Sequence, residues 1–317
     1  MFAICIEASH SRGMGHLFRA INLSKLLKKK GEQYIVLINN DDDAIRILKE
    51  NNICYDIVDL KDPISDWETK VILQYDITVW INDRLNTVKA HSLNVKKNNV
   101  LLVNFDDRGE GAKLSDINFV ALSLRNNEKL EGKNIYTGID YLILNEEIEH
   151  YRRIRTNIEH VVISMGGSDT HGVTIKIVEI YKRMNKKATI ILGPSFRHND
   201  LLNKMIDARF IVKRSVDSLL REFNNYDLAI TGGGITPYEA NASGLPCIIV
   251  ANETFEISNG KYLAGLGSSI FAGFHNYINI DAFTMELDIE KMSSVGIEKI
   301  PLYGTENIYK RISEIHG

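Results

Sequence analysis

The stretch Ser11-Arg12-Gly13-Met14-Gly15-His16-Leu17-Phe18-Arg19 stands between two apolar segments of different periodicity. Residues 2–6 form a continuous apolar run, and residues 17–30 form an amphipathic one, an order that predicts a strand, a glycine loop and a helix. Gly13 and Gly15 allow the backbone to turn sharply and to approach a ligand. The start of a helix attracts anions, and His16 stands there with a side chain that titrates near neutral pH. The stretch therefore predicts a site for chemistry on a phosphorylated molecule.

The same order of short β-branched runs and longer helical patterns continues along the chain. Strands are expected at residues 2–7, 34–38, 55–59, 77–81 and 100–105, with helices near 16–30, 42–51, 66–74 and 86–97. After a charged run with helical spacing, 145–155, which we interpret as a linker, strands are expected at 160–164, 188–192, 209–212, 228–230, 246–250 and 269–271. Helices are expected near 171–185, 198–206, 216–224, 236–243, 257–266 and 304–316. This alternation predicts an α/β fold of two parallel sheets, with ligands at the carboxyl ends of the strands.

The length and composition indicate two globular domains, because 44% of the 317 residues are hydrophobic and 25% are charged. We expect domains at residues 1–147 and 148–317, with a small-molecule site in the cleft between them. The net charge of −3 gives no support for a nucleic-acid partner. The basic runs 28–30 and 152–155 are expected to be solvated faces. The sequence leaves the oligomeric state open.

The sequence also favours a cytoplasmic location. No stretch reaches the ~20 apolar residues of a membrane-spanning helix, so no stable membrane insertion is expected. The N-terminus lacks the pattern of a signal peptide. The three cysteines form no CxxC pair, which is typical of reduced thiols and not of a disulfide framework or a zinc site. Asp169 and His171 have no third ligand nearby in sequence, so we expect no metal and no cofactor.

Two further glycine clusters follow expected strands in the second half of the chain. The first, Ser164-Met165-Gly166-Gly167-Ser168-Asp169, repeats the order of strand, loop and helix and is expected to cradle an anion. The alternative for Asp169 is that it only caps the helix. The second, Thr231-Gly232-Gly233-Gly234-Ile235-Thr236-Pro237-Tyr238-Glu239, lets the backbone pack against a diphosphate. Glu239 is suited to accept hydrogen bonds from sugar hydroxyls, or it only interacts favourably with the helix dipole.

Two other phosphate-binding motifs do not fit the first glycine loop. A dinucleotide-binding fingerprint needs a third glycine where Phe18 stands, and no Gly-Lys-Ser/Thr follows for a phosphate-binding Walker loop. His16 could simply be a helix-start residue that bonds to a neighbouring loop. In Phe255-Glu256-Ile257-Ser258-Asn259, which opens the next expected helix, Glu256 and Asn259 would face the ligand or would be solvated capping residues.

Three of these motifs resemble one group of sugar-nucleotide enzymes, in which they occur in the same order. They are Gly13–Arg19, Met165–Asp169 and Gly233–Glu239, and the segment Gly138-Ile139-Asp140-Tyr141-Leu142-Ile143-Leu144 resembles the same group before its linker. The chain is similar, over residues 2–270, to the UDP-sugar hydrolases of pseudaminic-acid biosynthesis and the related spore-coat polysaccharide glycosyltransferases. The resemblance implies the GT-B architecture, two Rossmann-like domains whose parallel sheets face a deep cleft, often with the last helix returning to the first domain. It also implies kinship with the transferase that makes lipid II.

The resemblance implies roles for single residues. His16 matches the catalytic histidine of the group's Gly-x-Gly-His-x-x-Arg motif, which also contains Gly13, Gly15 and Arg19. Glu239 matches its ribose-binding glutamate. Asn259 matches the asparagine of a Gln-x-x-Asn segment, in which Glu256 replaces the glutamine, and is expected to be catalytic together with His16 and Asp83. The residues expected to bind the nucleotide sugar are Gly13, Gly15, Arg19, Gly166, Gly167, Ser168, Gly233, Gly234, Thr236, Glu239 and Glu256.

One segment departs from the group's pattern. The hydrolases have an Asp-x-Tyr segment at the end of the fourth strand, whereas this chain has Asn82-Asp83-Arg84-Leu85-Asn86-Thr87. It resembles instead a branch with an Asp-x-Leu-Asp/Asn-Thr segment, followed by an acidic Asp106-Asp107-x-Gly loop and Gly111-Ala112. Asp83 is expected to orient His16 or to bind a sugar hydroxyl.

The expected activity is metal-independent, inverting cleavage at the anomeric carbon of a nucleotide-linked amino sugar. UDP is the favoured nucleotide, with other diphosphates or CMP as alternatives, and the pathway would be nonulosonic-acid or surface-polysaccharide biosynthesis. His16 would take a proton from the attacking hydroxyl. Water as the acceptor would make the protein a hydrolase, and a sugar or lipid hydroxyl would make it a glycosyltransferase. The third alternative is a non-catalytic sugar-nucleotide binding protein.

Overall fold

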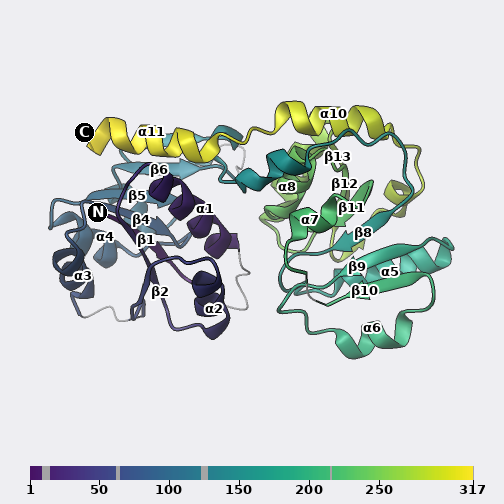
Figure 1. The fold of residues 1–317 in the computed structure, drawn as a ribbon, viewed down its shortest axis with the longest axis horizontal. Coiled ribbons are helices and arrows are strands. Elements are labelled where there is room, and N and C mark those ends of the chain that lie inside the picture. The colour runs from purple at the N-terminus through teal and green to yellow at the C-terminus, as the bar shows by residue number, and fades with distance from the viewer. Residues whose placement is uncertain (9–14, 62–64, 123–127, 215, 317) are drawn as a thin grey trace. The chain divides into compact units, whose positions relative to one another are not determined.

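Each half of the chain forms one seven-stranded sheet that is mainly parallel (Figure 1). The computed structural model describes residues 1–8, 15–61, 65–122, 128–214 and 216–316. It divides into two units: unit 1 comprises Met1–Leu144 and Tyr303–Gly317, and unit 2 comprises Asn145–Leu302. Gly13 lies outside the described residues, so its predicted role stays a prediction.

The sheet of unit 1 has the strand order β3-β2-β1-β4-β5-β6-β7, and every pair is parallel. Its strands are β1 (Phe2–Ile6), β2 (Tyr34–Ile38), β3 (Tyr55–Ile57), β4 (Val79–Asp83), β5 (Leu101–Phe105), β6 (Ile117–Val120) and β7 (Asn134–Thr137). Its helices are α1 (Gly15–Lys29), α2 (Asp42–Glu50), α3 (Trp67–Tyr75), α4 (Lys89–Lys96) and α11 (Gly304–His316), with 3₁₀ turns η1 (Glu110–Leu114) and η2 (Ile139–Tyr141).

The sheet of unit 2 repeats that order as β10-β9-β8-β11-β12-β13-β14, with only the last pair antiparallel. Its strands are β8 (Val161–Ser164), β9 (Ala188–Ile191), β10 (Phe210–Lys213), β11 (Leu228–Thr231), β12 (Cys247–Ala251), β13 (Ser269–Phe274) and β14 (Tyr277–Ile278). Its helices are α5 (Val173–Arg183), α6 (Asn199–Met205), α7 (Leu219–Phe223), α8 (Thr236–Ala242), α9 (Glu256–Leu266) and α10 (Ile289–Lys299), with η3 (Glu146–Tyr151) and η4 (Ile280–Phe283).

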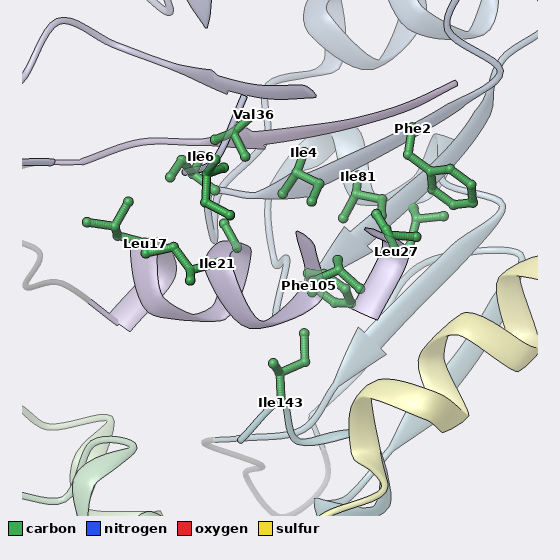
Figure 2. Packing of buried hydrophobic residues seen from close by; sticks show 14 of the residues in the cluster. Phe2, Ile4, Ile6, Leu17, Ile21, Leu27, Val36, Ile81, Phe105 and Ile143 are labelled. Atoms are coloured by element: carbon green, nitrogen blue, oxygen red, sulfur yellow. The ribbon is translucent and has the colours of Figure 1, made fainter. Parts of the chain in front are cut away.

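Unit 1 has two hydrophobic cores, one on each face of its sheet, because side chains alternate between the two faces along β4. Val79 and Ile81 pack with β1 and the apolar face of α1, whereas Trp80 belongs to the cluster on the opposite face. Figure 2 shows Leu17 and Ile21 of α1 packed among side chains of the sheet. Full burial of such a side chain contributes roughly 1.5–3 kcal/mol, so this face fixes α1, and with it residues 15–19, on the sheet.

The last helix, α11, belongs to unit 1. Gly304 opens it against the backbone carbonyl of Leu142, at a distance that leaves no room for a Cβ. The Tyr309 hydroxyl donates a 2.7 Å hydrogen bond to Glu32 beyond the end of α1. In the described part of the chain, no helix combines the length and the apolar composition that crossing a membrane requires.

Several expectations about single segments were wrong. Strands β6, β7 and β14 and helix α10 were not predicted. Within the linker run 145–155, the structure has one 3₁₀ turn, η3. Residues 28–30 are exposed as expected, but Arg155 is buried. Its guanidinium donates to the backbone carbonyls of Tyr226, Ser243 and Phe223, so it ties together the ends of α7 and α8.

Candidate functional sites at the two switch points

The predicted motifs lie where the strand order reverses in each sheet. In unit 1, β1 separates β2 from β4, so the chain leaves β1 and β4 in opposite directions. In unit 2, β8 separates β9 from β11 in the same way. Ligands of open parallel sheets bind at the carboxyl ends of such strands. His16 and Asp83 stand at this position in unit 1, and the two later glycine clusters stand there in unit 2.

In unit 1, His16, Arg19 and Asp83 form one cluster, in which Arg19 and Asp83 are buried and His16 is partly buried. The Nδ1 atom of His16 lies 2.6 Å from Asp83 Oδ1, and the side chain of Asp83 is only 2% exposed. The guanidinium of Arg19 donates to both oxygens of Asp83, through Nε at 2.9 Å and through Nη2. Asp83 therefore contacts both His16 and Arg19, which lie in the first turns of α1.

Asp106 completes this cluster from the end of β5. Its Oδ2 accepts from Nη1 of Arg19, and its Oδ1 accepts from the backbone N–H groups of Ala121 and Leu122, at 3.0 and 3.2 Å. Arg19 thus ties α1 to β4 and β5, and its three donor nitrogens all contact side chains of the cluster. The guanidinium is 6% exposed, which is a placement different from the sugar-contacting one that we predicted.

The cluster fixes the protonation of its members. Burial alone would raise the pKa of Asp83, but the charges and hydrogen bonds of Arg19 and His16 lower it to about 2. Burial opposes the charge of Arg19, yet Asp83 and Asp106 outweigh it and raise the pKa of the guanidinium. An ionised Asp83 can only accept, so Nδ1 of His16 carries the proton of this contact, and in the neutral ring Nε2 is then the acceptor. This is the arrangement of a histidine general base oriented by a carboxylate.

In unit 2, the conformation of the loop after β8 depends on two glycines, one in this loop and one in the loop after β9. Gly166 has a φ of +82°, a backbone conformation that favours glycine. Gly193, after β9, lies so close to the carbonyls of Gly166 and Gly167 that a Cβ would overlap them. Gly193 was not predicted, and its only sequence signal is its position directly after a strand. The Oγ of Ser168 lies 3.3 Å from Thr170 Oγ1.

Asp169 serves the helix that follows this loop. Its two carboxylate oxygens accept from the N–H groups of Val173 and Thr174, at 2.7 and 2.9 Å. These donors belong to the first turn of α5. Asp169 therefore caps this helix, which is the alternative that we considered for it from the sequence. Because Asp169 occupies these N–H groups, an anion at this loop has to use donors other than those of Val173 and Thr174.

The loop after β11 is held by the helix after β12. Oε2 of Glu256 accepts from the N–H groups of Gly233 and Asn252, at 3.1 and 2.7 Å, and Nδ2 of Asn259 donates to the carbonyl of Gly233 at 2.9 Å. Burial raises the pKa of Glu256, and these N–H groups partly offset the rise. Both backbone polar groups of Gly233 are therefore engaged within unit 2, whereas we had predicted contacts of Gly233, Glu256 and Asn259 with the substrate.

Two acceptors at this edge of the sheet lack a donor within the described residues. The carboxylate of Glu239, in the first turn of α8, is half-buried and accepts no hydrogen bond from them, and burial raises its pKa to about 7. Oδ1 of Asn252 is buried and also has no partner there. A buried acceptor left without a donor costs about 1–3 kcal/mol, so Asn252 favours a ligand that brings a hydroxyl or N–H donor. The half-buried carboxylate of Glu239 is open to the same kind of donor.

The neighbouring glycines of this loop predict a contrast in stability. A Cβ on Gly233 would lie 2.5 Å from the carbonyl oxygen of Glu256 and 2.7 Å from its Cβ, whereas a Cβ on Gly234 would meet only Oε1 of Glu256, at 3.6 Å. We expect Gly233→Ala to lower the free energy of unfolding of unit 2 by about 1–3 kcal/mol, because the overlap displaces α9. Gly234→Ala should change it by about 0.5 kcal/mol or less. Urea unfolding of both variants checks this, and equal values would contradict the described packing.

No family model matches the chain. An uncharacterized protein of Methanocaldococcus jannaschii is 27% identical, over 98% of this chain and 68% of that protein. The spore coat polysaccharide biosynthesis protein SpsG of Bacillus subtilis is 21% identical, over 85% of this chain and 83% of that protein.

Solved structures are similar over nearly the whole chain. MurG of Acinetobacter baumannii has a TM-score of 0.69 at 14% identity, with 99% of both chains covered. The UDP-GlcNAc 2-epimerase of Neisseria meningitidis, bound to UDP-GlcNAc, has a TM-score of 0.64 at 13% identity, with 99% of this chain and 100% of that chain covered. The predicted α/β fold of GT-B type is thereby confirmed.

Proposed function

We propose that the protein cleaves the bond between the anomeric carbon and the diphosphate of a nucleotide-linked amino sugar in the cytoplasm, with His16 as the general base. The observation that carries the proposal is the 2.6 Å contact of His16 Nδ1 with the buried carboxylate of Asp83. It leaves Nε2 as an acceptor for the proton of an attacking hydroxyl. As the new C–O bond forms at the anomeric carbon, the bond to the diphosphate breaks, and the nucleotide leaves with the electron pair.

We assign the nucleotide to unit 2 and the reacting sugar to the His16 centre of unit 1. Glu239 would accept hydrogen bonds from the ribose hydroxyls, as its unpartnered carboxylate favours, and Gly166, Gly167, Ser168, Gly234 and Thr236 would line the diphosphate. The Neisseria meningitidis epimerase, which has the same fold, was solved with UDP-GlcNAc, and this supports UDP as the nucleotide.

Three residues have positioning roles in this proposal. Arg19 holds Asp83 and Asp106, and Glu256 and Asn259 hold the loop of Gly233. None of the three needs to touch the substrate. Gly15 is the first residue of α1 and directly precedes His16. We keep the predicted contact of Gly13 with the substrate as part of the proposal.

The acceptor distinguishes two versions of the reaction. Water makes the protein a hydrolase, which is our first proposal. A sugar or lipid hydroxyl makes it a glycosyltransferase, and two observations favour this second version. The segment Asn82–Thr87 lacks the tyrosine of the hydrolases, and the Bacillus subtilis relative is named for polysaccharide biosynthesis.

Nucleotide release with and without an acceptor tests the proposal. The protein is incubated with a panel of UDP- and CMP-linked amino sugars, in the presence of a chelator, and the free nucleotide is measured. Release without an acceptor supports the hydrolase, and release that needs a hydroxyl acceptor supports the transferase. Tight binding with no turnover across the panel would contradict both and leave a sugar-nucleotide binding protein.

The raised pKa of Glu239 predicts how nucleoside binding depends on pH. The carboxylate is the better acceptor for ribose hydroxyls, and it is lost as the pH falls through about 7 in the free protein. The affinity for uridine should therefore rise between pH 5.5 and 8. Uridine serves as the ligand because it carries no phosphate that titrates in this range. Calorimetry should show this rise for the unmodified protein and a flat, weaker affinity for Glu239→Gln. If the affinity of Glu239→Gln for uridine also rises with pH, a titrating group other than Glu239 causes the rise.

A further inference from the structure

A second buried polar cluster lies on the other face of β4, against α3 and α4. His91 of α4 is in contact with Glu68 of α3 through Nδ1 at 2.8 Å and with Asn82 of β4 through Nε2 at 2.9 Å. All three side chains are buried. Side chains alternate along a strand, so Asn82 faces this cluster while its neighbour Asp83 faces His16. No prediction from the sequence singled out Glu68 or His91.

The direction of each hydrogen bond in this cluster follows from one indole. Nε1 of Trp80 can only donate, and it lies 2.9 Å from Asn82 Oδ1, which is therefore the acceptor. Nε2 of His91 contacts the same oxygen, so it must donate and carry a proton. The amide nitrogen of Asn82 then donates to Asn104 Oδ1 at 3.1 Å, and that of Asn104 donates to Asp107 Oδ2 at 2.6 Å.

The contact between His91 and Glu68 needs a second proton. Nδ1 of the ring and Oε1 of the carboxyl group lie 2.8 Å apart, and two lone pairs at this distance would repel each other. Burial lowers the pKa of His91, and the hydrogen bond to Glu68 offsets this only in part. The pair therefore holds the proton on Glu68 or on the ring, and in either state Nε2 still donates to Asn82.

This series of hydrogen bonds ends at the loops after β4 and β5, next to the carboxylates of the His16 centre. Oδ1 of Asp107 accepts from the N–H groups of Thr87 and Gly109, both at 2.9 Å. These groups belong to the loops that follow β4 and β5, and Asp83 and Asp106 stand at the start of the same loops. A Cβ on Gly109 would lie 2.5 Å from the backbone nitrogen of Thr87, so the two loops are packed together tightly.

We propose that Glu68 and His91 form a positioning pair for the His16 centre. The pair shares a proton, fixes the orientation of Asn82, and acts through Asn104 and Asp107 on the loops after β4 and β5. It thereby holds Asp83 where Nδ1 of His16 needs an acceptor. Its effect on catalysis rests on the proposed function, whereas its effect on the tautomer of His16 does not.

NMR of the unmodified protein, with ¹⁵N-labelled histidine, tests the pair without any substrate. At a pH where His16 is neutral, we expect Nδ1 of His16 to carry the proton and Nε2 to carry none. We expect the Nε2–H of His91 to be present and protected from exchange with solvent. An unprotonated Nε2 on His91 would overturn the proposed chain, whether or not the protein turns over a nucleotide sugar.

Two variants test the effect of the pair on His16. His91→Leu removes the donor to Asn82, so we expect His16 to populate both neutral tautomers and kcat to fall about 10- to 100-fold, with KM changed less than about threefold. Glu68→Gln is the matched control, because its amide can donate to Nδ1 of His91 while its oxygen accepts from Asn94, as Glu68 does now. We expect it to retain kcat within about threefold and to retain the tautomer of His16.

A purely structural role would lower the stability of His91→Leu and leave its folded state with an unchanged His16 tautomer and an unchanged kcat, and that result would overturn the proposal. If His91→Leu does not fold, His91→Gln replaces it. The amide of the glutamine can still donate to Asn82, so His16 should retain its tautomer in this variant. Loss of the His16 tautomer in His91→Gln would contradict the proposal.

Discussion

Replacing His16 by alanine should lower kcat by about 100- to 10,000-fold, the range that proton transfer by a positioned side chain contributes. The variant loses the acceptor for the proton of the attacking hydroxyl, while the ion pairs of Arg19 with Asp83 and Asp106 remain. The fold should therefore be retained, and the affinity for UDP should change little because we assign the nucleotide to unit 2. Steady-state kinetics and calorimetry with UDP separate these effects.

His160→Ala is the matched control for this variant. The side chain of His160 is 68% exposed at the start of β8, away from the strand ends that carry the motifs, and its removal should leave kcat unchanged. A His16→Ala variant that binds UDP, is folded and keeps the turnover of the unmodified protein would remove His16 from the mechanism.

Replacing Arg19 by methionine should lower the free energy of unfolding of unit 1 by about 3–5 kcal/mol. The substitution keeps much of the apolar stem but leaves Asp83 and Asp106 buried without their cation. In the unmodified protein, Asp83 stays ionised down to a pKa of about 2, so it adds stability above the pKa of about 3.8 of an unfolded aspartate. That stability is lost as the pH falls from about 4 to 2.

The pH dependence distinguishes this explanation from simple loss of packing. Without Arg19, only His16 opposes the effect of burial, so we expect the pKa of Asp83 to rise and folding to favour its protonated form. The gap in stability between the unmodified protein and Arg19→Met should therefore narrow as the pH falls from 7 to 4, as measured by urea unfolding. Arg46→Ala, which removes an exposed ion pair with Asp43, is the control and should change stability by about 0.5 kcal/mol or less. A gap that is constant with pH would contradict the buried-charge account.

The sequence predicted the fold well because its signals are local. Glycine loops that follow apolar runs placed α1 and α8 at the ends of β1 and β11, and the repeated alternation predicted both sheets. Of the strands that were missed, β6 contains Asn118 and β7 begins at Asn134 and ends at Thr137, so neither forms a continuous apolar run, and β14 has only two residues. Helix α10 was missed because Ser293, Ser294 and Gly296 interrupt its apolar pattern.

The sequence predicted less of the candidate site, because much of it depends on contacts between distant segments. The sequence predicted that Asp83 orients His16 or binds a sugar hydroxyl. It could not predict that Arg19 contacts both Asp83 and Asp106, because this depends on the packing of α1 on β4 and β5. Glu68 and His91 look like ordinary polar residues of amphipathic helices, and only the tertiary fold buries them together. Arg155 was misjudged for the same reason, since a basic run in sequence gives no sign that one member is surrounded by carbonyl groups.

The most direct test of the account is the position of the broken bond. A nucleotide sugar that the protein turns over is incubated in ¹⁸O-labelled water, or with a labelled hydroxyl acceptor, and the products are analysed by mass spectrometry and by NMR before the sugar anomers equilibrate. We predict that the label appears only on the anomeric carbon, with inverted configuration, and that the rate depends on His16. Label on the phosphate of the released nucleotide, or retained configuration, would contradict attack at the anomeric carbon by a hydroxyl that His16 deprotonates.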